Sequence, residues 1–300
     1  KLDKWIFVQF LSDNKEEHKR LEECRRSGNE LCGKLNEIKL KEITIVDVES
    51  KTNEALAFAE GITLGNYQFL KYLKKTDDRI NSLRDIKLFS PKISRDKINK
   101  LNIILESTYK CRDLINEPVS FLSAPQLAKE IQEMGRECGA KVEVMNKKKI
   151  ESLKMGGLLA VNKGSVDPPT FTIMEWKPDN PVNKKPYIFV GKGIVYDTGG
   201  LNKKKKKNME DMKSDMSGAA AVAASVYAIS KARLPVHVIG LIPATDNRLS
   251  GNAYASGDVI RMYDGTTVEI INTDAEGRMI LADALSYAKH YNPFLTVDAA

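Results

Sequence analysis

The chain has 300 residues, of which 42% are hydrophobic and 29% charged, and this composition excludes bulk disorder. It carries 47 Lys+Arg against 40 Asp+Glu, so the formal net charge is +7, which permits an anionic partner without requiring one. At roughly 150 residues per domain, the length predicts two domains.

Strand and helix signals alternate along the chain. Strands are predicted where β-branched and aromatic residues run together, at Trp5–Leu11, Ile43–Val48, Lys141–Met145, Thr170–Trp176, Tyr187–Val190, Val236–Ile242, Thr267–Ile271 and Leu295–Val297. Helices are predicted from apolar residues at helical spacing, at 53–73, 97–114, 123–138, 150–159, 218–234 and 277–291. Ser123–Gln126 has the pattern of a capping box, and residues 74–100 have the composition of a linker or domain edge.

This alternation predicts an α/β fold. We expect a smaller N-terminal α/β domain over residues 1–100 and a larger domain over residues 101–300, whose mainly parallel sheet is flanked by helices. Because the last residues, Leu295–Ala300, read as the middle of a strand, we expect the chain to be truncated at its C-terminus.

The four cysteines form no C-x-x-C pair, so we expect free thiols in a reducing compartment instead of a disulfide framework or a cysteine–zinc site. No apolar run approaches the roughly 18 residues of a membrane helix. The apolar stretch Trp5–Leu11 has no small-residue cleavage site after it, unlike a signal peptide. These features predict a soluble, cytoplasmic protein that contacts no membrane.

Two polar clusters follow predicted strands, where ligands bind in α/β sheets. The first, Gly191–Gly200, holds Lys192 and Asp197 among glycines that let the backbone turn tightly and let a ligand approach. A phosphate-binding P-loop fits poorly because G-x-x-x-x-G-K-[ST] is absent. A solvated loop is the alternative for this cluster taken alone.

The second cluster, Asn272–Arg278, spaces Asp274, Glu276 and Arg278 two residues apart. In an extended or turn backbone this period puts all three side chains on one side. Neighbouring carboxylates repel one another unless a cation lies between them, and Arg278 could itself supply that cation. The start of the helix predicted from Gly277 would also favour an anion.

Together with Asp215, which precedes the helix at 218–234, these clusters place four carboxylates at or near strand ends of one sheet: Asp197, Asp215, Asp274 and Glu276. The three histidines lie outside the clusters and H-E-x-x-H is absent, so a metal site here must use oxygen ligands. Such ligands suit Mg²⁺ or Mn²⁺ and also accept Zn²⁺. Four carboxylates are too many for one catalytic ion with open positions, and they suit two ions that activate a water between them.

Three motifs resemble the leucyl (cytosol) aminopeptidase family of di-metal exopeptidases. They are Val190–Gly200 (VGKGIVYDTGG), Met212–Ala220 (MKSDMSGAA) and Asn272–Arg278 (NTDAEGR), the last being close to a family signature. The likeness covers roughly residues 110–300 well and is weak over 1–100. It implies that residues 101–300 are a metallopeptidase catalytic domain, incomplete at Ala300, that removes leucine-like N-terminal residues from peptides. It also implies a homo-oligomer, a hexamer in the family.

The resemblance implies metal-binding roles position by position. Lys192 would be a neutral amine ligand of one ion, which also holds Asp215. Asp274 would bind the other ion, and Asp197 and Glu276 would bridge the two. The ions would be Mn²⁺ or Zn²⁺, with Mg²⁺ an option at one site.

The resemblance also implies three roles toward the substrate. Lys204 falls at the position of a lysine that steadies the oxyanion of the tetrahedral intermediate. Arg278 falls where the family holds a bicarbonate-like anion that acts as general base for the bridging water. Met212 matches a residue that lines the pocket for the first side chain of the substrate.

The run Lys203–Lys207 departs from the family, whose members usually carry one lysine there. Spacing selects Lys204 as that lysine, and the neighbours Lys203 and Lys205 leave the register open. The run also supports an alternative function, nucleic-acid binding, although no aromatic residues interleave with it for base stacking. A two-metal phosphoesterase is a further alternative that uses the same carboxylate chemistry.

Overall fold

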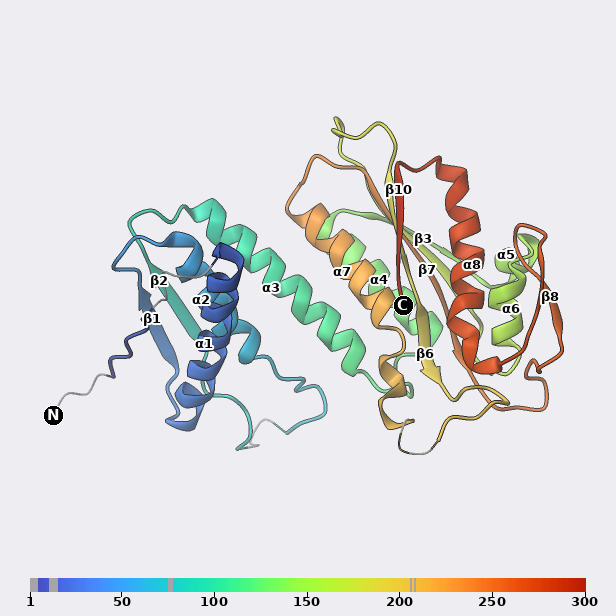
Figure 1. The fold of residues 1–300 in the computed structure, drawn as a ribbon, viewed down its shortest axis with the longest axis horizontal. Coiled ribbons are helices and arrows are strands. Elements are labelled where there is room, and N and C mark those ends of the chain that lie inside the picture. Colours follow the sequence, from blue (N-terminus) through green and yellow to red (C-terminus); the bar gives the residue numbers. More distant parts are fainter. Residues whose placement is uncertain (1–4, 11–15, 75–77, 206, 208) are drawn as a thin grey trace. The chain divides into compact units, whose positions relative to one another are not determined.

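The computed structural model describes residues 5–10, 16–74, 78–205, 207 and 209–300. The chain divides into two compact units, Lys1–Glu106 and Ser107–Ala300 (Figure 1). Helix α3 (Arg95–Asn116) contains the boundary between them. Within the described ranges, every helix falls short of the length or the hydropathy that crossing a lipid bilayer requires.

The N-terminal unit packs two helices against a two-stranded parallel sheet. Strand β1 (Glu42–Val46) is joined to β2 (Asp85–Phe89) through α2 (Thr52–Gly65), and α1 (Glu17–Glu37) packs along α2. Every second residue of each strand turns inward, as a half-buried sheet requires. The buried side chains at the centre of this unit are Leu31, Cys32, Leu35, Ile62 and Leu83.

Several predictions for the N-terminal region are wrong. Residues 5–10 form no strand, and Leu11 lies outside the described residues. Helix α2 ends at Gly65 instead of Leu73, because Asn66 closes the helix and its side-chain amide donates to Leu83 O (3.0 Å). Of the two alternatives for residues 74–100, a linker or a domain edge, the linker is wrong, because the segment contains β2, which pairs with β1 along its whole length.

Strand β7 (Val238–Asn247) lies inside the sheet of the C-terminal unit, where the order is β10-β5-β7-β4-β3 and β6 also pairs with β7. The sheet is parallel at three of its five pairings, which confirms the predicted mainly parallel sheet. All ten residues of β7 are buried, since helices cover both faces of the sheet. The other strands are β3 (Lys141–Met145), β4 (Thr170–Trp176), β5 (Tyr187–Gly191), β6 (Gly193–Asp197) and β10 (Leu295–Ala299).

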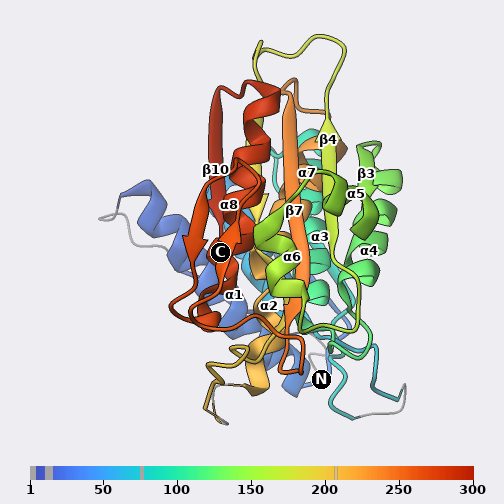
Figure 2. The same cartoon turned by 90° about the vertical axis from the view of Figure 1, so that its right-hand side faces the viewer.

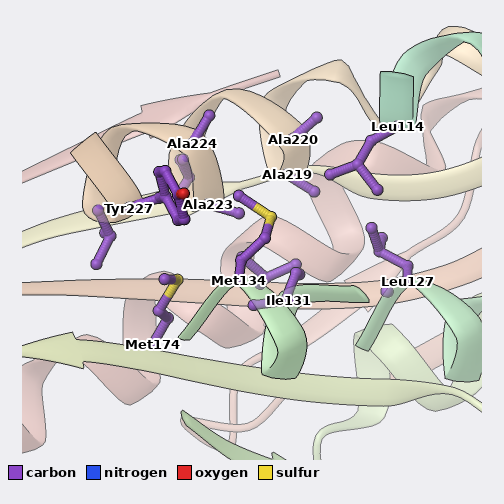
Figure 3. Close-up of a cluster of buried hydrophobic side chains, with 14 of the residues drawn as sticks. Leu114, Leu127, Ile131, Met134, Met174, Ala219, Ala220, Ala223, Ala224 and Tyr227 are labelled. Atoms are coloured by element: carbon purple, nitrogen blue, oxygen red, sulfur yellow. The ribbon is translucent and has the colours of Figure 1, made fainter. Parts of the chain in front are cut away.

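Helices lie on both faces of the sheet (Figure 2), and a hydrophobic core fills the space between the sheet and the helices on each face. On one face α4 (Ala124–Cys138) and α7 (Ser217–Lys231) pack through residues such as Ile131, Met134 and Tyr227, as Figure 3 shows. On the other face lie α5 (Lys147–Ser152), α6 (Gly156–Asn162) and α8 (Glu276–Ala288). The short helical turns η2 (Glu210–Ser214), η3 (Thr273–Ala275) and η4 (Lys289–Tyr291) complete the unit.

Four local predictions for this unit need correction. Gly193–Asp197 is a strand and not a loop, because it pairs in parallel with β7. The predicted strand 267–271 lies outside the main sheet, since β9 (Thr267–Glu269) pairs only with β8 (Val259–Arg261). The helix at 150–159 is two helices, α5 and α6. No capping box forms before α4, because the Ser123 side chain makes no cap hydrogen bond and the Ser123 N–H donates to Phe121 O (3.1 Å).

Candidate metal centre

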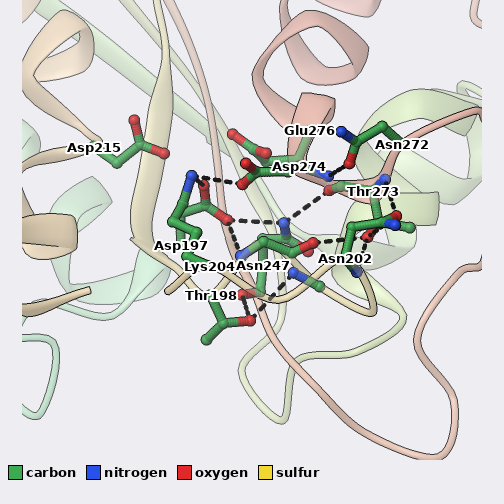
Figure 4. Close-up of polar contacts among 12 residues, drawn as sticks. Asp197, Thr198, Asn202, Lys204, Asp215, Asn247, Asn272, Thr273, Asp274 and Glu276 are labelled. Carbon is green, nitrogen blue, oxygen red and sulfur yellow. Dashed lines mark hydrogen bonds and ion pairs between the residues drawn. The ribbon is translucent and has the colours of Figure 1, made fainter. Parts of the chain in front are cut away.

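Four chain segments bring charged side chains together beside the end of β7 (Figure 4). Lys192 lies at the junction of β5 and β6, and Asp197 ends β6. Asp215 follows η2 directly before α7. Asp274 lies within η3, and Glu276 begins α8. The structure therefore brings together all five residues that were predicted as metal ligands. Asp274 and Glu276 follow the separate two-stranded sheet of β8 and β9, and not a strand of the main sheet.

The Lys192 ammonium lies between two carboxylates. Its Nζ is 2.8 Å from Asp215 Oδ1 and 3.0 Å from Glu276 Oε1. The Lys192 backbone is held on both sides, because its N–H donates to Ala299 O (2.9 Å) and its C=O accepts from Ala219 N (2.9 Å). Gly277 lies against this side chain, because a Cβ there would lie 2.6 Å from Lys192 Cε and would force the lysine to shift.

The Lys204 ammonium lies between a second pair of carboxylates. Its Nζ is 2.8 Å from Asp197 Oδ2 and 2.5 Å from Asp274 Oδ1. The Lys204 side chain is 19% exposed, whereas Lys203 and Lys205 are exposed residues. Within the predicted basic run, Lys204 is thus turned toward the acidic cluster. Lys206 lies outside the described residues.

Asp197, Asp215 and Glu276 form the part of the cluster best suited to a cation. Each offers one carboxylate oxygen, and these three atoms lie within 4.8 Å of one another. Among the described residues, Asp215 Oδ2 and Glu276 Oε2 are buried without a hydrogen-bond partner. An unpaired buried carboxylate oxygen is unfavourable, and carboxylates are the ligands that hard divalent cations prefer. The donor set therefore fits a divalent metal ion.

Burial and charge shift the pKa values within the cluster. Burial, assisted by the neighbouring Glu276 and Asp197 charges, raises the pKa of the Asp215 carboxyl to about 6, although Lys192 opposes this shift. Burial alone would lower the pKa of the Lys192 amine, but Asp215 and Glu276 outweigh it and the pKa is raised. Burial likewise opposes charge on Lys204, and Asp197 and Asp274 raise its pKa well above the ordinary lysine value.

Two further predicted residues lie at the border of the cluster. Arg278 is exposed, and among the described residues it makes no ion pair with Asp274 or Glu276. The suggestion that Arg278 separates these carboxylates is therefore wrong, because the cations that contact them are Lys204 and Lys192. Met212 is half-buried in η2, three residues before Asp215.

Sequence reasoning missed the polar residues that hold the cluster in place. Asn247 donates to Asp197 Oδ1 (2.8 Å) and to Thr273 O (3.0 Å). Asn202 Oδ1 accepts from Thr273 N (2.8 Å), and the Thr273 hydroxyl donates to Gly199 O (2.7 Å). A signal was present for Asn247, which follows the apolar run of β7 at a strand end, where ligand-site residues are expected. The predicted strand stops at Ile242, so its predicted end lies five residues before Asn247.

The covered, mainly parallel sheet and the carboxylates at its strand ends define an α/β protein with a candidate divalent-metal site. The model of the cytosol aminopeptidase family, catalytic domain, matches residues 109–300. The chain therefore belongs to the cytosol aminopeptidase family, which confirms the resemblance seen in its motifs.

Similar proteins agree with this assignment. A probable cytosol aminopeptidase of Chlorobium limicola is 46% identical over 259 residues, covering 81% of this chain and 51% of that protein. The bottromycin maturation enzyme BotP, solved in complex with Mn, has a TM-score of 0.83 and 31% identity, covering 93% of this chain and 60% of that one. The cytosol aminopeptidase of Coxiella burnetii has a TM-score of 0.79 and 30% identity, covering 91% and 57%. The chain thus spans about half the length of the relatives it matches.

Proposed function

We propose that this chain carries the metal centre of a metal-dependent aminopeptidase. The observation that carries the proposal is the pair of buried carboxylate oxygens, Asp215 Oδ2 and Glu276 Oε2, that lack a partner among the described residues. A bound cation would offset the free-energy cost of burying them. The aminopeptidase names of the relatives support the reaction class, and the BotP complex with Mn supports a divalent ion.

For the metal-binding residues we keep the assignment that the family resemblance implies. Asp197 and Glu276 would be shared by two ions, Lys192 and Asp215 would bind one, and Asp274 the other. Mn²⁺ or Zn²⁺ would suit these ligands, with Mg²⁺ an option at one site. When bound, such ions act as Lewis acids and lower the pKa of a water molecule. Lys192 must lose its proton to serve as a ligand, so metal binding would release protons.

Lys204 would act on the substrate. Because Asp197 and Asp274 raise its pKa, its ammonium stays charged at neutral pH. A charged donor in a mostly buried site is suited to stabilise the oxygen of a peptide carbonyl as negative charge develops on it. The Lys204 backbone N–H also donates to Thr198 O (2.9 Å), which ties the lysine segment to the turn after β6.

Arg278 and Met212 would complete the site. Arg278 is exposed beside Gly277 and makes no ion pair with an acid among the described residues, so it can hold a small anion such as bicarbonate. That anion would accept a proton as general base. Met212 offers an apolar surface near Asp215, which suits a leucine-like side chain at the N-terminus of a peptide. Assembly into a hexamer stays a prediction from the family.

The test is hydrolysis of leucine p-nitroanilide by the complete polypeptide, first freed of metal with a chelator and then supplied with Mn²⁺ or Zn²⁺. We expect hydrolysis to disappear when the metal is removed and to return when Mn²⁺ or Zn²⁺ is added. Glu276→Gln should lower kcat by on the order of a hundredfold or more, while Glu54→Gln, a buried glutamate paired with Arg20 in the N-terminal unit, should leave it unchanged. Hydrolysis of p-nitrophenyl phosphate without anilide hydrolysis would instead establish the phosphoesterase alternative.

A further inference from the structure

One asparagine side chain connects two of the segments that carry the acidic cluster. Asn247 is the last residue of β7 and is 1% exposed. Both protons of its side-chain amide are used. Nδ2 donates to Asp197 Oδ1 at 2.8 Å and to Thr273 O at 3.0 Å (Figure 4). These acceptors lie 50 residues before and 26 residues after it in the chain.

The contact with Asp197 fixes the orientation of its carboxylate. Oδ1 accepts from Asn247 Nδ2 and from Gly199 N, both at 2.8 Å. Oδ2 is thereby left to face Lys204, at 2.8 Å. One oxygen of this carboxylate is held by the fold and the other points to the charged centre, so rotation of the group would break two hydrogen bonds.

The contact with Thr273 fixes the segment that carries the other acidic residues. Thr273 begins the turn η3, which contains Asp274 and leads directly into Glu276. Its carbonyl also accepts from the Tyr254 hydroxyl (2.8 Å). On the opposite side, the Asn247 carbonyl accepts from Thr198 N (3.0 Å) and Thr198 Oγ1 (2.9 Å), just after Asp197.

We propose that Asn247 is the positioning residue that sets the separation between Asp197 and Glu276 and thereby the affinity of the cluster for divalent cations. Its amide donates to the Asp197 carboxylate and to the Thr273 carbonyl, so it acts through the two segments that it joins. This inference rests on the proposed metal-binding function and adds a residue to it. Groups that orient metal ligands typically change metal affinity about 10–100-fold when removed.

A second buried asparagine in the same unit provides a matched control. Asn162 is 3% exposed, and its Nδ2 also donates two hydrogen bonds, to Asp167 O (2.8 Å) and Thr245 Oγ1 (3.1 Å). None of the contacts described for Asn162 involves a carboxylate of the cluster. Asn162→Ser and Asn247→Ser therefore remove the same number of hydrogen bonds from similarly buried sites, and they differ in whether the metal ligands are affected.

The experiment is titration of the metal-free complete polypeptide with Mn²⁺, following free Mn²⁺ by electron paramagnetic resonance. We expect Asn247→Ser to weaken Mn²⁺ binding about 10–100-fold and Asn162→Ser to leave it unchanged, while both lower the unfolding midpoint similarly. If Asn247→Ser does not fold, Asn247→Thr, whose hydroxyl is likewise a single donor and whose methyl group fills more of the vacated volume, should show the same loss of about 10–100-fold.

Two results would overturn the inference: wild-type Mn²⁺ affinity in a folded Asn247 variant, or an equal loss of affinity in Asn162→Ser. Failure of the proposed function gives a different result, because the unsubstituted protein would then bind no Mn²⁺ at the cluster at all.

Discussion

Replacing Lys204 by methionine removes a charge from the cluster while keeping the length of the side chain. The ammonium makes two ion pairs, at 2.8 Å with Asp197 and 2.5 Å with Asp274, and the Asp197 side chain is only 2% exposed. Removing one partner of a buried ion pair costs about 3–5 kcal/mol, whereas exposed pairs contribute about 0.2–1 kcal/mol. Asp197 keeps its hydrogen bonds to Gly199 and Asn247, so we expect a loss of roughly 2 kcal/mol in the metal-free protein.

The pH at which this loss is measured follows from the sign of the pKa shift. The pKa of Lys204 is raised in the folded state, so its stabilisation is fully present below the ordinary lysine pKa of about 10.4 and is lost as the pH rises through the folded value. Measurements near neutral pH therefore contain the whole effect. Added Mn²⁺ should recover part of the lost stability, because a cation would again compensate Asp197 and Asp274.

The assay is urea unfolding in the presence of a chelator, followed by the fluorescence of Trp176, which is buried in β4 of the C-terminal unit. Trp5 is replaced by phenylalanine throughout, so that one tryptophan reports. Lys203→Met and Lys205→Met are the controls, and we expect them to change stability by less than about 0.5 kcal/mol because both side chains are exposed. A loss of unfolding free energy below about 0.5 kcal/mol for Lys204→Met, or an equal loss for Lys203→Met, would refute the reasoning.

Three other substitutions or conditions separate metal binding from stability. Gly277→Ala places a Cβ 2.6 Å from Lys192 Cε, so the Lys192 side chain must shift and Mn²⁺ affinity measured by calorimetry should fall about tenfold or more. Unchanged affinity would contradict this. Asp283 is fully buried and accepts hydrogen bonds from two backbone N–H groups. Asp283→Asn should therefore lower the free energy of unfolding, measured by thermal unfolding, by about 1–3 kcal/mol. The control Asp179→Asn, at an exposed position, should change it little. Burial raises the pKa of the Asp215 carboxyl to about 6, so a proton competes with the metal for this carboxylate near that pH. We expect the affinity for Mn²⁺ to fall as the pH drops through that value. An affinity that stays constant across this range would count against Asp215 as a ligand.

Most of the C-terminal unit could be predicted from its hydrophobic pattern. The strands at 141–145 and 170–176 were predicted with the bounds that the structure shows, and β7 shows the unbroken apolar run of a strand covered on both faces. The four carboxylates are predicted because they lie at or near predicted strand ends, where ligands bind in α/β sheets, whereas Lys192 is assigned as a ligand only through the family resemblance. The rule that ligands lie at the carboxyl ends of strands accounts for Asp197, at the end of β6. Asp274 and Glu276 reach the same place from a turn that follows the separate β8–β9 sheet, which that rule does not predict.

Other features depend on contacts that a linear pattern does not contain. Helix α1 was missed because its buried face is built partly from Cys24, Gly28 and Cys32, which weaken the apolar periodicity. The glycines that flank strand β6 favour a loop in the sequence, and only its pairing with β7 makes it a strand. The role of Asn247 follows from partners that the fold brings to it from distant parts of the chain.

The most direct test of the metal centre is a crystal structure of the complete protein soaked with Mn²⁺, with the ions located by their anomalous scattering. We expect two anomalous peaks within about 4 Å of each other, enclosed by Asp197, Asp215, Asp274 and Glu276. Saturating Mn²⁺ that leaves this cluster without a peak, or that gives peaks only elsewhere on the protein, would contradict the assignment.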